Sequence, residues 1–308
     1  MSGPACTPSR PRSTPADSPC IVTPLVSIPT ERWRALLIKD ETKQVCGAFN
    51  YRGIRYRLAS AASGRGMATA STGNHAAGLA MAARGTMRDL DAFVPATTPA
   101  AKLRRIEEHG ARLHLIEGGY DDCERLARAY GARHGLDYIH AFDDPQVIAG
   151  HQSLFSEIGR VAALPDMAFV PVGGGGLVSA AIMAWGRLGT RVIGVEHCCA
   201  PAMAESLRAG RPVSAQVLAG AAEGLLIKRV GDYPFAVCSD YGLAVETVDD
   251  SEIEAAVRLL YVEAGIRAEF AGAAALAAAL RYHAPEKRAL CVISGGNIDD
   301  QRWERCLT

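Results

Sequence analysis

The chain has 308 residues, the length of one large domain or of two domains in close contact. Its 33 Lys and Arg residues balance its 33 Asp and Glu residues, which argues against a nucleic-acid or membrane partner held by positive charge. Nine cysteines, with no Cys-x-x-Cys spacing and one adjacent pair at Cys198-Cys199, predict reduced thiols in a cytoplasmic protein and argue against a disulfide framework or a zinc site.

Residues 1–20 carry five prolines among Ser, Thr and Arg, and we expect a disordered tail there. From Ile21 onward, short apolar runs alternate with helical patterns, and none is long enough to cross a bilayer. This alternation predicts an α/β fold with a mostly parallel sheet covered by helices on both faces. The expected strands are Ala35–Ile38, Met67–Ala70, Ala92–Val94, Leu113–Ile116, Ala168–Val172, Val192–Val195 and Ala289–Ile293.

Two of the intervening helices have recognisable ends. Thr98-Pro99 predicts an N-cap followed by proline at the first helical position, and Gly110 closes that helix. Ser251, followed three residues later by Glu254, predicts a capping box at the start of another helix.

Four consecutive glycines, Gly173–Gly176, join the strand Ala168–Val172 to the next helix. Without Cβ atoms, several backbone N–H groups can approach an anion here, and the helix dipole favours a phosphate. The alternative is a turn that is merely close-packed, for which one glycine would suffice. The spacing matches neither the Walker A pattern nor a dinucleotide fingerprint.

Two further polar turns follow predicted strands, Ser71–His75 and Ser294–Asn297. Hydroxyls and an amide at a helix start can bind a carboxylate, although Ser71 or Thr72 would also serve as a simple N-cap. In a parallel sheet, all three turns lie at the carboxyl edge, where ligands bind. A phosphate site and a carboxylate site on one edge suggest a conjugate of pyridoxal phosphate and an amino acid.

Together these motifs resemble the fold-type II pyridoxal-phosphate enzymes, specifically the threonine/serine dehydratase and serine racemase group, from about Ile21 to the C-terminus. The matching segments are Thr23–Leu25, Ile38–Glu41, Gly47–Gly53, Ser71–His75, Gly173–Leu177, Gly194–Glu196, Ala222–Leu225, Glu269–Ala273 and Ser294–Asn297. The resemblance implies two domains. A large cofactor-binding domain would comprise residues 21–65 and 142–308, and a small domain that binds the substrate carboxylate would comprise residues 66–141.

The resemblance also implies roles for individual residues. Gly173, Gly174, Gly175, Gly176 and Leu177 would hold the cofactor phosphate. Asn74 would bind the ring 3′-oxygen, Ser294 would face the pyridine nitrogen, and Glu269 would belong to the ring pocket. Ser71, Thr72 and His75 would bind the substrate carboxylate, and Thr72 could relay a proton. Phe49 would pack against the ring or fill the core.

The motif Gly47-Ala-Phe-Asn50 departs from the family, which has Gly-Ser-Phe-Lys with a lysine that forms the Schiff base with the cofactor. Asn50 is neither nucleophilic nor basic at pH 7, so we do not expect it to be catalytically competent. The five lysines of the chain all lie elsewhere: Lys39, Lys43, Lys102, Lys228 and Lys287. Lys43 is the nearest candidate replacement in sequence, and the alternative for each lysine is a structural or surface role.

A second departure concerns the divalent cation of the racemase-like members, which use a Glu, a carbonyl and an Asp as ligands. The matching positions are Glu196, Ala200 and Ala202, so one carboxylate is missing and we predict no such metal.

The resemblance thus implies a dehydratase-like ammonia-lyase for a small β-substituted amino acid such as serine or threonine, with racemisation less favoured. Without the lysine, three hypotheses remain: a lyase that uses a preformed cofactor adduct or the substrate amine as base, a pseudo-enzyme that binds pyridoxal phosphate non-covalently and acts as a partner or regulator, or an introduced Asn50 in an ordinary dehydratase. A nucleotide-binding α/β protein with Glu196 at the ribose is a distant alternative. The family resemblance suggests a homodimer.

Overall fold

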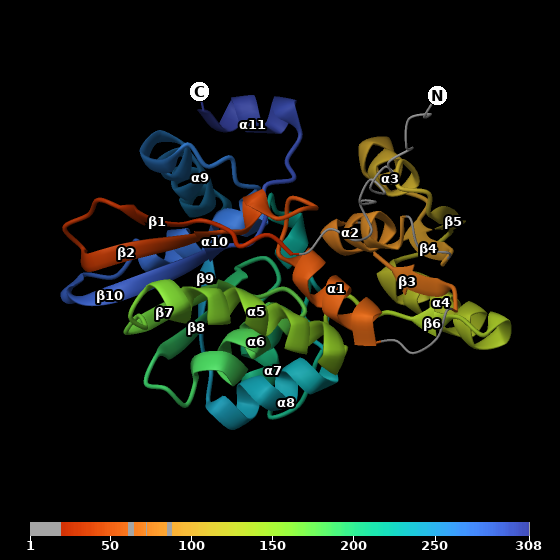
Figure 1. Cartoon of the computed structure of the whole chain (residues 1–308), viewed down its shortest axis with the longest axis horizontal. Helices are drawn as coiled ribbons and strands as arrows, with labels where there is room; N and C mark the ends of the chain where they lie inside the picture. Colours follow the sequence, from red (N-terminus) through yellow and green to blue (C-terminus); the bar gives the residue numbers. More distant parts are fainter. Residues whose placement is uncertain (1–19, 61–64, 72, 85–87, 308) are drawn as a thin grey trace, which may run out of the picture.

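The computed structural model describes residues 20–60, 65–71, 73–84 and 88–307, and it forms two sheets with helices on both faces (Figure 1). The predicted tail lies, except for Cys20, outside the described residues. The strands are β1 (Leu25–Ile28), β2 (Trp33–Asp40), β3 (Met67–Ala70), β4 (Leu90–Pro95), β5 (Arg112–Ile116), β6 (Asp137–Tyr138), β7 (Met167–Pro171), β8 (Arg191–His197), β9 (Ala244–Val248) and β10 (Ala284–Ile293). All the expected strands are therefore present.

The helices alternate with these strands as the apolar pattern predicted. They are α1 (Asn50–Ser60), α2 (Asn74–Ala83), α3 (Ala100–Glu107), α4 (Tyr120–His134), α5 (Pro145–Val161), α6 (Gly176–Trp185), α7 (Ala202–Ala209), α8 (Asp232–Tyr241), α9 (Asp250–Ala264), α10 (Phe270–Ala279) and α11 (Asp300–Leu307). Two short 3₁₀ turns, η2 (Glu41–Lys43) and η3 (Glu223–Leu225), complete the described part. None of the described helices is both long and apolar enough to cross a membrane.

The larger sheet has the strand order β1-β2-β10-β7-β8-β9, and all its neighbouring pairs are parallel except β1 with β2. Its side chains alternate between two cores, as a strand period of two requires. Met167 and Phe169 face a core shared with α9, α10 and α11, whereas Ala168 and Val170 face a core shared with α5, α6, α7 and α8. The mostly parallel α/β architecture inferred from the sequence is confirmed.

The smaller sheet has the order β5-β4-β3-β6 and is parallel throughout. Its strands come from one continuous stretch of chain, between Met67 and Tyr138. Helices α2 and α3 cover one face and α4 covers the other. Helix α1 leads from the larger sheet toward the smaller one and packs against α5 and α2 (Figure 1).

Two predicted helix starts differ from the observed ones. Helix α3 begins after Pro99, which is itself the N-cap, so Thr98 lies one residue outside. Helix α9 is capped by Asp249 with Glu252 in a reciprocal capping box, and not by Ser251 with Glu254. Because aspartate is as good a cap as serine, the sequence offered two overlapping capping patterns.

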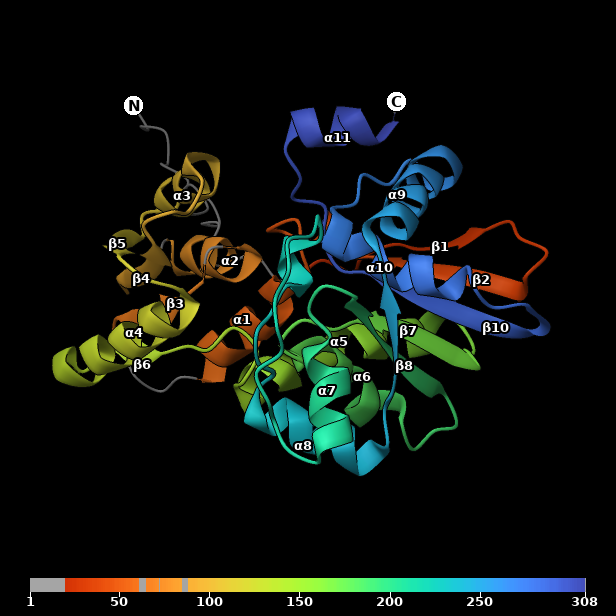
Figure 2. The ribbon, with the colours of Figure 1, turned by 180° about the vertical axis from the view of Figure 1, so that it is seen from behind.

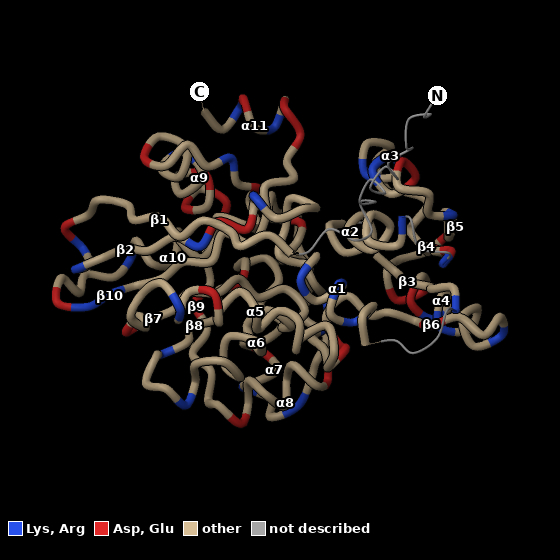
Figure 3. The backbone as a smooth tube through the Cα atoms, viewed as in Figure 1, with Lys and Arg blue, Asp and Glu red and all other residues tan. Residues whose placement is uncertain are grey.

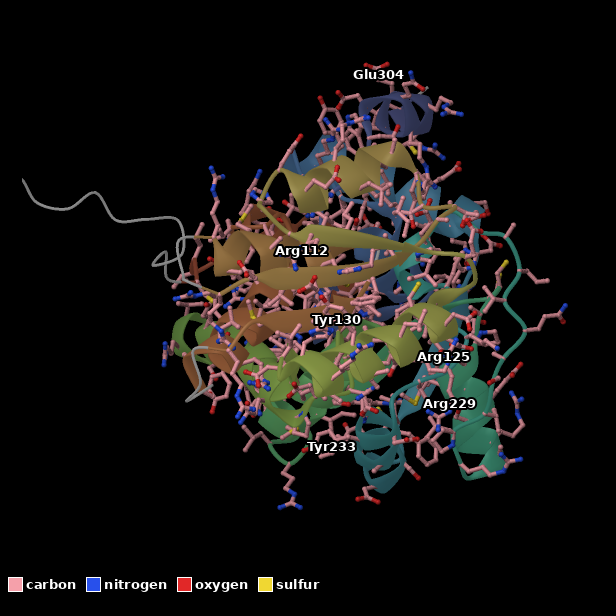
Figure 4. The ribbon with its side chains drawn as sticks, turned by 90° about the vertical axis from the view of Figure 1, so that its right-hand side faces the viewer. Arg112, Arg125, Tyr130, Arg229, Tyr233 and Glu304 are labelled. Carbon is pink, nitrogen blue, oxygen red and sulfur yellow. The ribbon has the colours of Figure 1, made fainter. Side chains whose placement is uncertain are left out.

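Lys and Arg are interspersed with Asp and Glu over both parts of the molecule (Figure 3). The segment between α7 and α8 runs beside the smaller sheet (Figure 2), and two ion pairs connect it to that part. Lys228 pairs with Asp121 at 3.1 Å, and Lys102 pairs with Glu223. Figure 4 views this side, with Arg125 and Tyr130 on α4, Arg229 on the segment between α7 and α8, and Tyr233 on α8.

Candidate active site

The turn after β10 holds the motif that contains Asn50. The Phe49 amide donates to the Ser294 carbonyl at 2.9 Å, and the Gly296 amide donates to the Gly47 carbonyl at 3.0 Å. Ala48 and Gly295 form an isolated antiparallel bridge. Three predicted site residues, Phe49, Asn50 and Ser294, are therefore held together at the carboxyl end of β10.

Asn74, at the start of α2, is oriented by a chain of side-chain hydrogen bonds. Its Nδ2 donates to Glu269 Oε1 at 2.8 Å, and its Oδ1 accepts from Asn297 Nδ2 at 2.8 Å. Asn297 also donates to the Cys46 carbonyl at 2.9 Å. Since an amide nitrogen has two hydrogens and the described residues accept only one, Asn74 keeps one donor for a ligand. Asn297 was missed as a site residue, although the Ser294–Asn297 motif ends on it.

Glu269 is surrounded by protein atoms, and this burial raises the pKa of its carboxyl to about 7, partly offset by the hydrogen bond from Asn74. A Cβ placed on Gly295 would lie 2.4 Å from Glu269 Oε1 and 3.3 Å from Asn74 Nδ2. Glycine is therefore required at Gly295 for Glu269 and Asn74 to approach the turn after β10.

The glycine turn opens α6 at the carboxyl end of β7, the neighbour of β10 in the sheet. Gly175 is the N-cap with φ of 97°, a conformation that favours glycine. A Cβ on Gly174 would lie 2.1 Å from the Phe142 ring, and one on Gly173 would lie 2.7 Å from the Gly224 carbonyl. Phe142 was not identified from the sequence, and Gly224, within the matching segment Ala222–Leu225, was given no role there, because both reach this turn only through the tertiary fold.

The glycine turn, Gly173–Gly176, and the side chains hydrogen-bonded to Asn74 meet near the start of α10. A Cβ on Gly224, which packs against Gly173, would lie 3.0 Å from the Ala271 side chain. Gly272 approaches Gly295 so closely that a Cβ would lie 2.3 Å from its carbonyl oxygen. Four segments distant in sequence, around Gly173, Gly224, Gly272 and Gly295, therefore converge on one edge of the larger sheet.

Asn50, at the position where the sequence pattern predicts a lysine, is the first residue of α1. Lys39 cannot replace it, because its Nζ is buried and bound to Glu157 Oε2 and the Thr23 carbonyl, both at 2.7 Å. Lys102 and Lys228 are engaged by Glu223 and Asp121, and Lys43 and Lys287 are exposed.

The predicted carboxylate turn is only partly described. Thr72 lies outside the described residues, and Ser71 Oγ accepts from the Gly73 amide at 3.2 Å. His75 points into the protein, and neither of its ring nitrogens has a hydrogen-bond partner among the described residues. The same holds for Tyr51 Oη and His151 Nδ1, and the His151 ring packs 4.8 Å from that of Phe49. Buried polar atoms of this kind normally bind a partner or an ordered water.

The carboxylate of Glu196, at the end of β8, already has hydrogen-bond partners within the protein. Both carboxylate oxygens of Glu196 accept from α7 amides, those of Met203 at 2.6 Å and Ala204 at 2.9 Å. A cavity of about 550 Å³ has none of the predicted site residues in its lining. It is lined by Arg57, Arg128, Tyr138, His140, Asp143, Asp144, Pro145 and Gln146.

A helix that begins with glycines and a side-chain network at the same edge of a parallel α/β sheet are typical of an enzyme that binds a phosphorylated cofactor. The model of the pyridoxal-phosphate dependent enzyme family matches residues 18–295, so the chain belongs to that family and pyridoxal phosphate is its cofactor. The residues fit this group, since α6 amides suit its phosphate, and Asn74 and Ser294 offer polar groups for its ring.

Individual relatives agree with this assignment. The chain is 34% identical over 280 residues to the L-threonine ammonia-lyase of Thermotoga maritima, covering 88% of this chain and 69% of the relative. It resembles the processed form of threonine deaminase isoform 2 from Solanum lycopersicum with a TM-score of 0.86 and 29% identity, covering 93% and 87% of the two chains. It also resembles maize serine racemase with a TM-score of 0.85 and 26% identity, covering 93% and 91%. The chain is thus an amino-acid lyase-like member of its family.

Proposed function

We propose that this protein binds pyridoxal phosphate without a covalent bond, together with a small β-substituted α-amino acid such as serine or threonine, and does not turn the amino acid over at the rate of a lysine-containing lyase. The observation that carries this proposal is the contrast within one cluster. Polar side chains and glycines suited to a ligand lie together there: Asn74, Glu269, Asn297 and the glycine turn. The residue beside them is Asn50, whose amide cannot replace an amine.

Bound pyridoxal phosphate supplies an electron sink for the α-carbon of an amino acid. The α6 amides and the glycine turn would hold the phosphate, and the remaining amide hydrogen of Asn74 would be available to the ring oxygen. Ser294 would offer a neutral hydroxyl to the ring nitrogen, and Ser71 and Thr72 are proposed to receive the substrate carboxylate. The side chain of His75, for which the sequence predicted the same role, is buried and points into the protein instead. Asn50 can donate a hydrogen bond but cannot attack a carbonyl or accept the α-proton.

The two sheets support the domain division inferred from the sequence. The strands of the smaller sheet all lie within residues 66–141, and those of the larger sheet lie within residues 21–65 and 142–308. We propose that the ligand binds where these two parts meet.

The test is an absorption spectrum with added pyridoxal phosphate, followed by borohydride reduction and mass analysis, on the unmodified chain, Asn50→Lys and Asn50→Gln. We expect all three to bind the cofactor and only Asn50→Lys to be labelled at residue 50. Keto-acid release from serine or threonine should rise at least about a thousandfold in Asn50→Lys and not in Asn50→Gln, because only the lysine restores an amine. Borohydride labelling of the unmodified chain at another lysine would contradict the proposal.

Glu269 favours a second candidate, a slow ammonia-lyase. With a pKa of about 7, its carboxyl is partly protonated at neutral pH and can take up or release a proton. This candidate requires keto-acid release by the unmodified chain and its loss in Glu269→Gln, whereas the first proposal requires no such release.

A further inference from the structure

The buried histidine His140 fixes a short turn that follows β6. Its Nδ1 accepts from the Phe142 amide at 3.2 Å and from the Asp143 amide at 2.8 Å. A ring nitrogen that accepts hydrogen bonds carries no hydrogen, so the ring hydrogen of His140 is on Nε2. The ring also packs edge-to-face on the Phe142 ring, with centroids 4.5 Å apart. One side chain therefore holds both the backbone and the aromatic ring of the residues that follow it.

His140 is itself held by helix α4 of the smaller sheet. Its Nε2 lies 3.3 Å from Glu124 Oε1, which also accepts from Arg128 Nε at 2.8 Å. The hydrogen bonds from His140 and then from Arg128 lower the pKa of the Glu124 carboxyl to about 2, so this acceptor is charged at neutral pH. The orientation of the ring is thus set by the smaller sheet, whereas the turn that it fixes faces the larger one.

Phe142 connects this turn to the glycines that open α6. A Cβ on Gly174 would lie 2.1 Å from the Phe142 ring, and a Cβ on Gly176 would lie 3.1 Å from the Phe142 carbonyl oxygen. The ring and the backbone of Phe142 therefore form one wall of the glycine turn. A shift of Phe142 would change the space that the glycine turn occupies.

Asp143 connects the same turn to Gly174 a second time. Its carboxylate accepts from the amides of Asp232 at 3.1 Å and Tyr233 at 3.0 Å, in the first turn of α8. The residue before them, Gly231, donates its amide to the Gly174 carbonyl at 3.1 Å. A Cβ on Gly231 would lie 2.9 Å from the Cβ of Asp143, so these two segments are in direct contact. Phe142 and Asp143 therefore constrain the same glycine.

We propose that His140 is a positioning residue for the cofactor phosphate. By accepting the amides of Phe142 and Asp143, it fixes the glycine turn in the conformation whose N–H groups receive that phosphate. This inference rests on the proposed function, in which the glycine turn holds the phosphate. Backbone donors that are already in place bind an anion without the cost of ordering them first. Without the ring, two amides lose their acceptor, and the turn rearranges to satisfy them.

The test compares the binding of pyridoxine 5′-phosphate with that of pyridoxine, by isothermal titration calorimetry. The two ligands differ only in the phosphate, and neither has an aldehyde that reacts with lysines. The variants are His140→Leu, His140→Gln and His140→Asn, with His114→Leu as the matched control. The His114 ring has similar contacts away from the glycine turn, because its Nε2 lies 2.7 Å from Asp91 Oδ1 and it stacks on Phe93 with centroids 4.4 Å apart.

We expect the unmodified chain to prefer pyridoxine 5′-phosphate, and His140→Leu to reduce that preference at least about tenfold. His140→Gln, whose amide reaches the position of Nε2, should show the same loss while keeping a polar side chain if the leucine variant does not fold. His140→Asn should retain the preference within about threefold, because its Oδ1 takes the place of Nδ1 and accepts both amides. The control His114→Leu should retain it too.

The ratio of the two affinities separates positioning from stability, because a general loss of structure weakens both ligands alike. An unchanged ratio in His140→Leu and His140→Gln would overturn the proposal, as would an equal loss of preference in His140→Asn or in His114→Leu. If the unmodified chain itself shows no preference for pyridoxine 5′-phosphate, the phosphate does not bind at the glycine turn. That result would contradict this part of the proposed function and the role of His140 together.

Discussion

At the scale of single residues, two histidines are held neutral inside the protein. Burial lowers the pKa of His75 to about 4, and the nearby His140 lowers it further. Burial also lowers the pKa of His151 to about 3, with a smaller contribution from His75. An unfolded histidine has a pKa near 6.5, so unfolding takes up protons below that pH and the folded state loses stability as the pH falls.

We therefore predict a pH-dependent difference between the unmodified chain and His151→Gln. Between pH 7 and pH 5, the unmodified chain should lose about 2 kcal/mol of unfolding free energy relative to the variant, which has no titrating group there. Urea unfolding at several pH values measures this difference. A difference independent of pH would mean that His151 has the same pKa in the folded and unfolded states, and it would contradict the burial argument.

Only the comparison with His151→Gln isolates the contribution of His151, because Glu269 changes the unfolding free energy with pH in the opposite direction. Its pKa of about 7 lies above that of a free carboxyl, so the folded state retains a proton that the unfolded state has lost. The stability that Glu269 contributes is full below the unfolded pKa and is lost as the pH rises toward 7. The stability curve of the unmodified chain alone would therefore mix the two effects.

At the scale of elements, the start of α6 depends on glycines, which have no Cβ atom. We predict that Gly174→Ala lowers the free energy of unfolding by about 1–3 kcal/mol and weakens pyridoxal phosphate binding, because the new Cβ would overlap the Phe142 ring. The control is Gly159→Ala on the exposed side of α5, where a Cβ meets only Leu164 at 4.0 Å. That change should stabilise the chain by about 0.5–1 kcal/mol. Equal effects of the two changes would refute the steric argument.

Helix α9 offers a test of which residue caps it. Asp249 Oδ1 accepts from the Glu252 amide at 3.0 Å, whereas Ser251 Oγ only donates to Asp249 at 2.7 Å. We expect Asp249→Ala to lower the melting temperature by about 2 °C and Ser251→Ala to lower it less. Thermal unfolding of both variants decides the assignment, and the reverse order would restore the serine cap predicted from the sequence.

At the scale of the whole molecule, a buried ion network joins the N-terminal segment, β2, η2, α1 and α5. Arg52 donates to Glu41 Oε2 at 2.7 Å and to Glu157 Oε1 at 2.6 Å, and Lys39 donates to Glu157 Oε2 at 2.7 Å. The Thr23 hydroxyl accepts from Arg52 at 3.1 Å. Glu157 is thus the shared partner of two buried cations.

We predict that Glu157→Ala lowers the free energy of unfolding by about 3–5 kcal/mol, because it leaves two buried cations short of a counter-charge. The control Asp121→Ala breaks an exposed ion pair with Lys228 and should change stability little. Chemical denaturation of both variants measures the contrast. A loss below 1 kcal/mol in Glu157→Ala would show that water replaces the missing carboxylate.

Much of this protein follows from its sequence because the determining interactions are local. Apolar runs of strand length identify the strands without reference to distant residues. The glycines before α6 and the motif around Asn50 likewise predict, from local sequence alone, an anion-binding turn and a missing amine. The alternation of strands with helices likewise fixes a parallel sheet, since each parallel connection needs a crossover.

The tertiary structure decided what depends on residues far apart in the chain. Asn297 orients Asn74 across 223 positions, Phe142 sets the space at Gly174, and Asp250 holds the His197 ring by a hydrogen bond across 53 positions. None of these contacts has a periodic signal, because packing and hydrogen bonding act between surfaces that only the completed fold brings together.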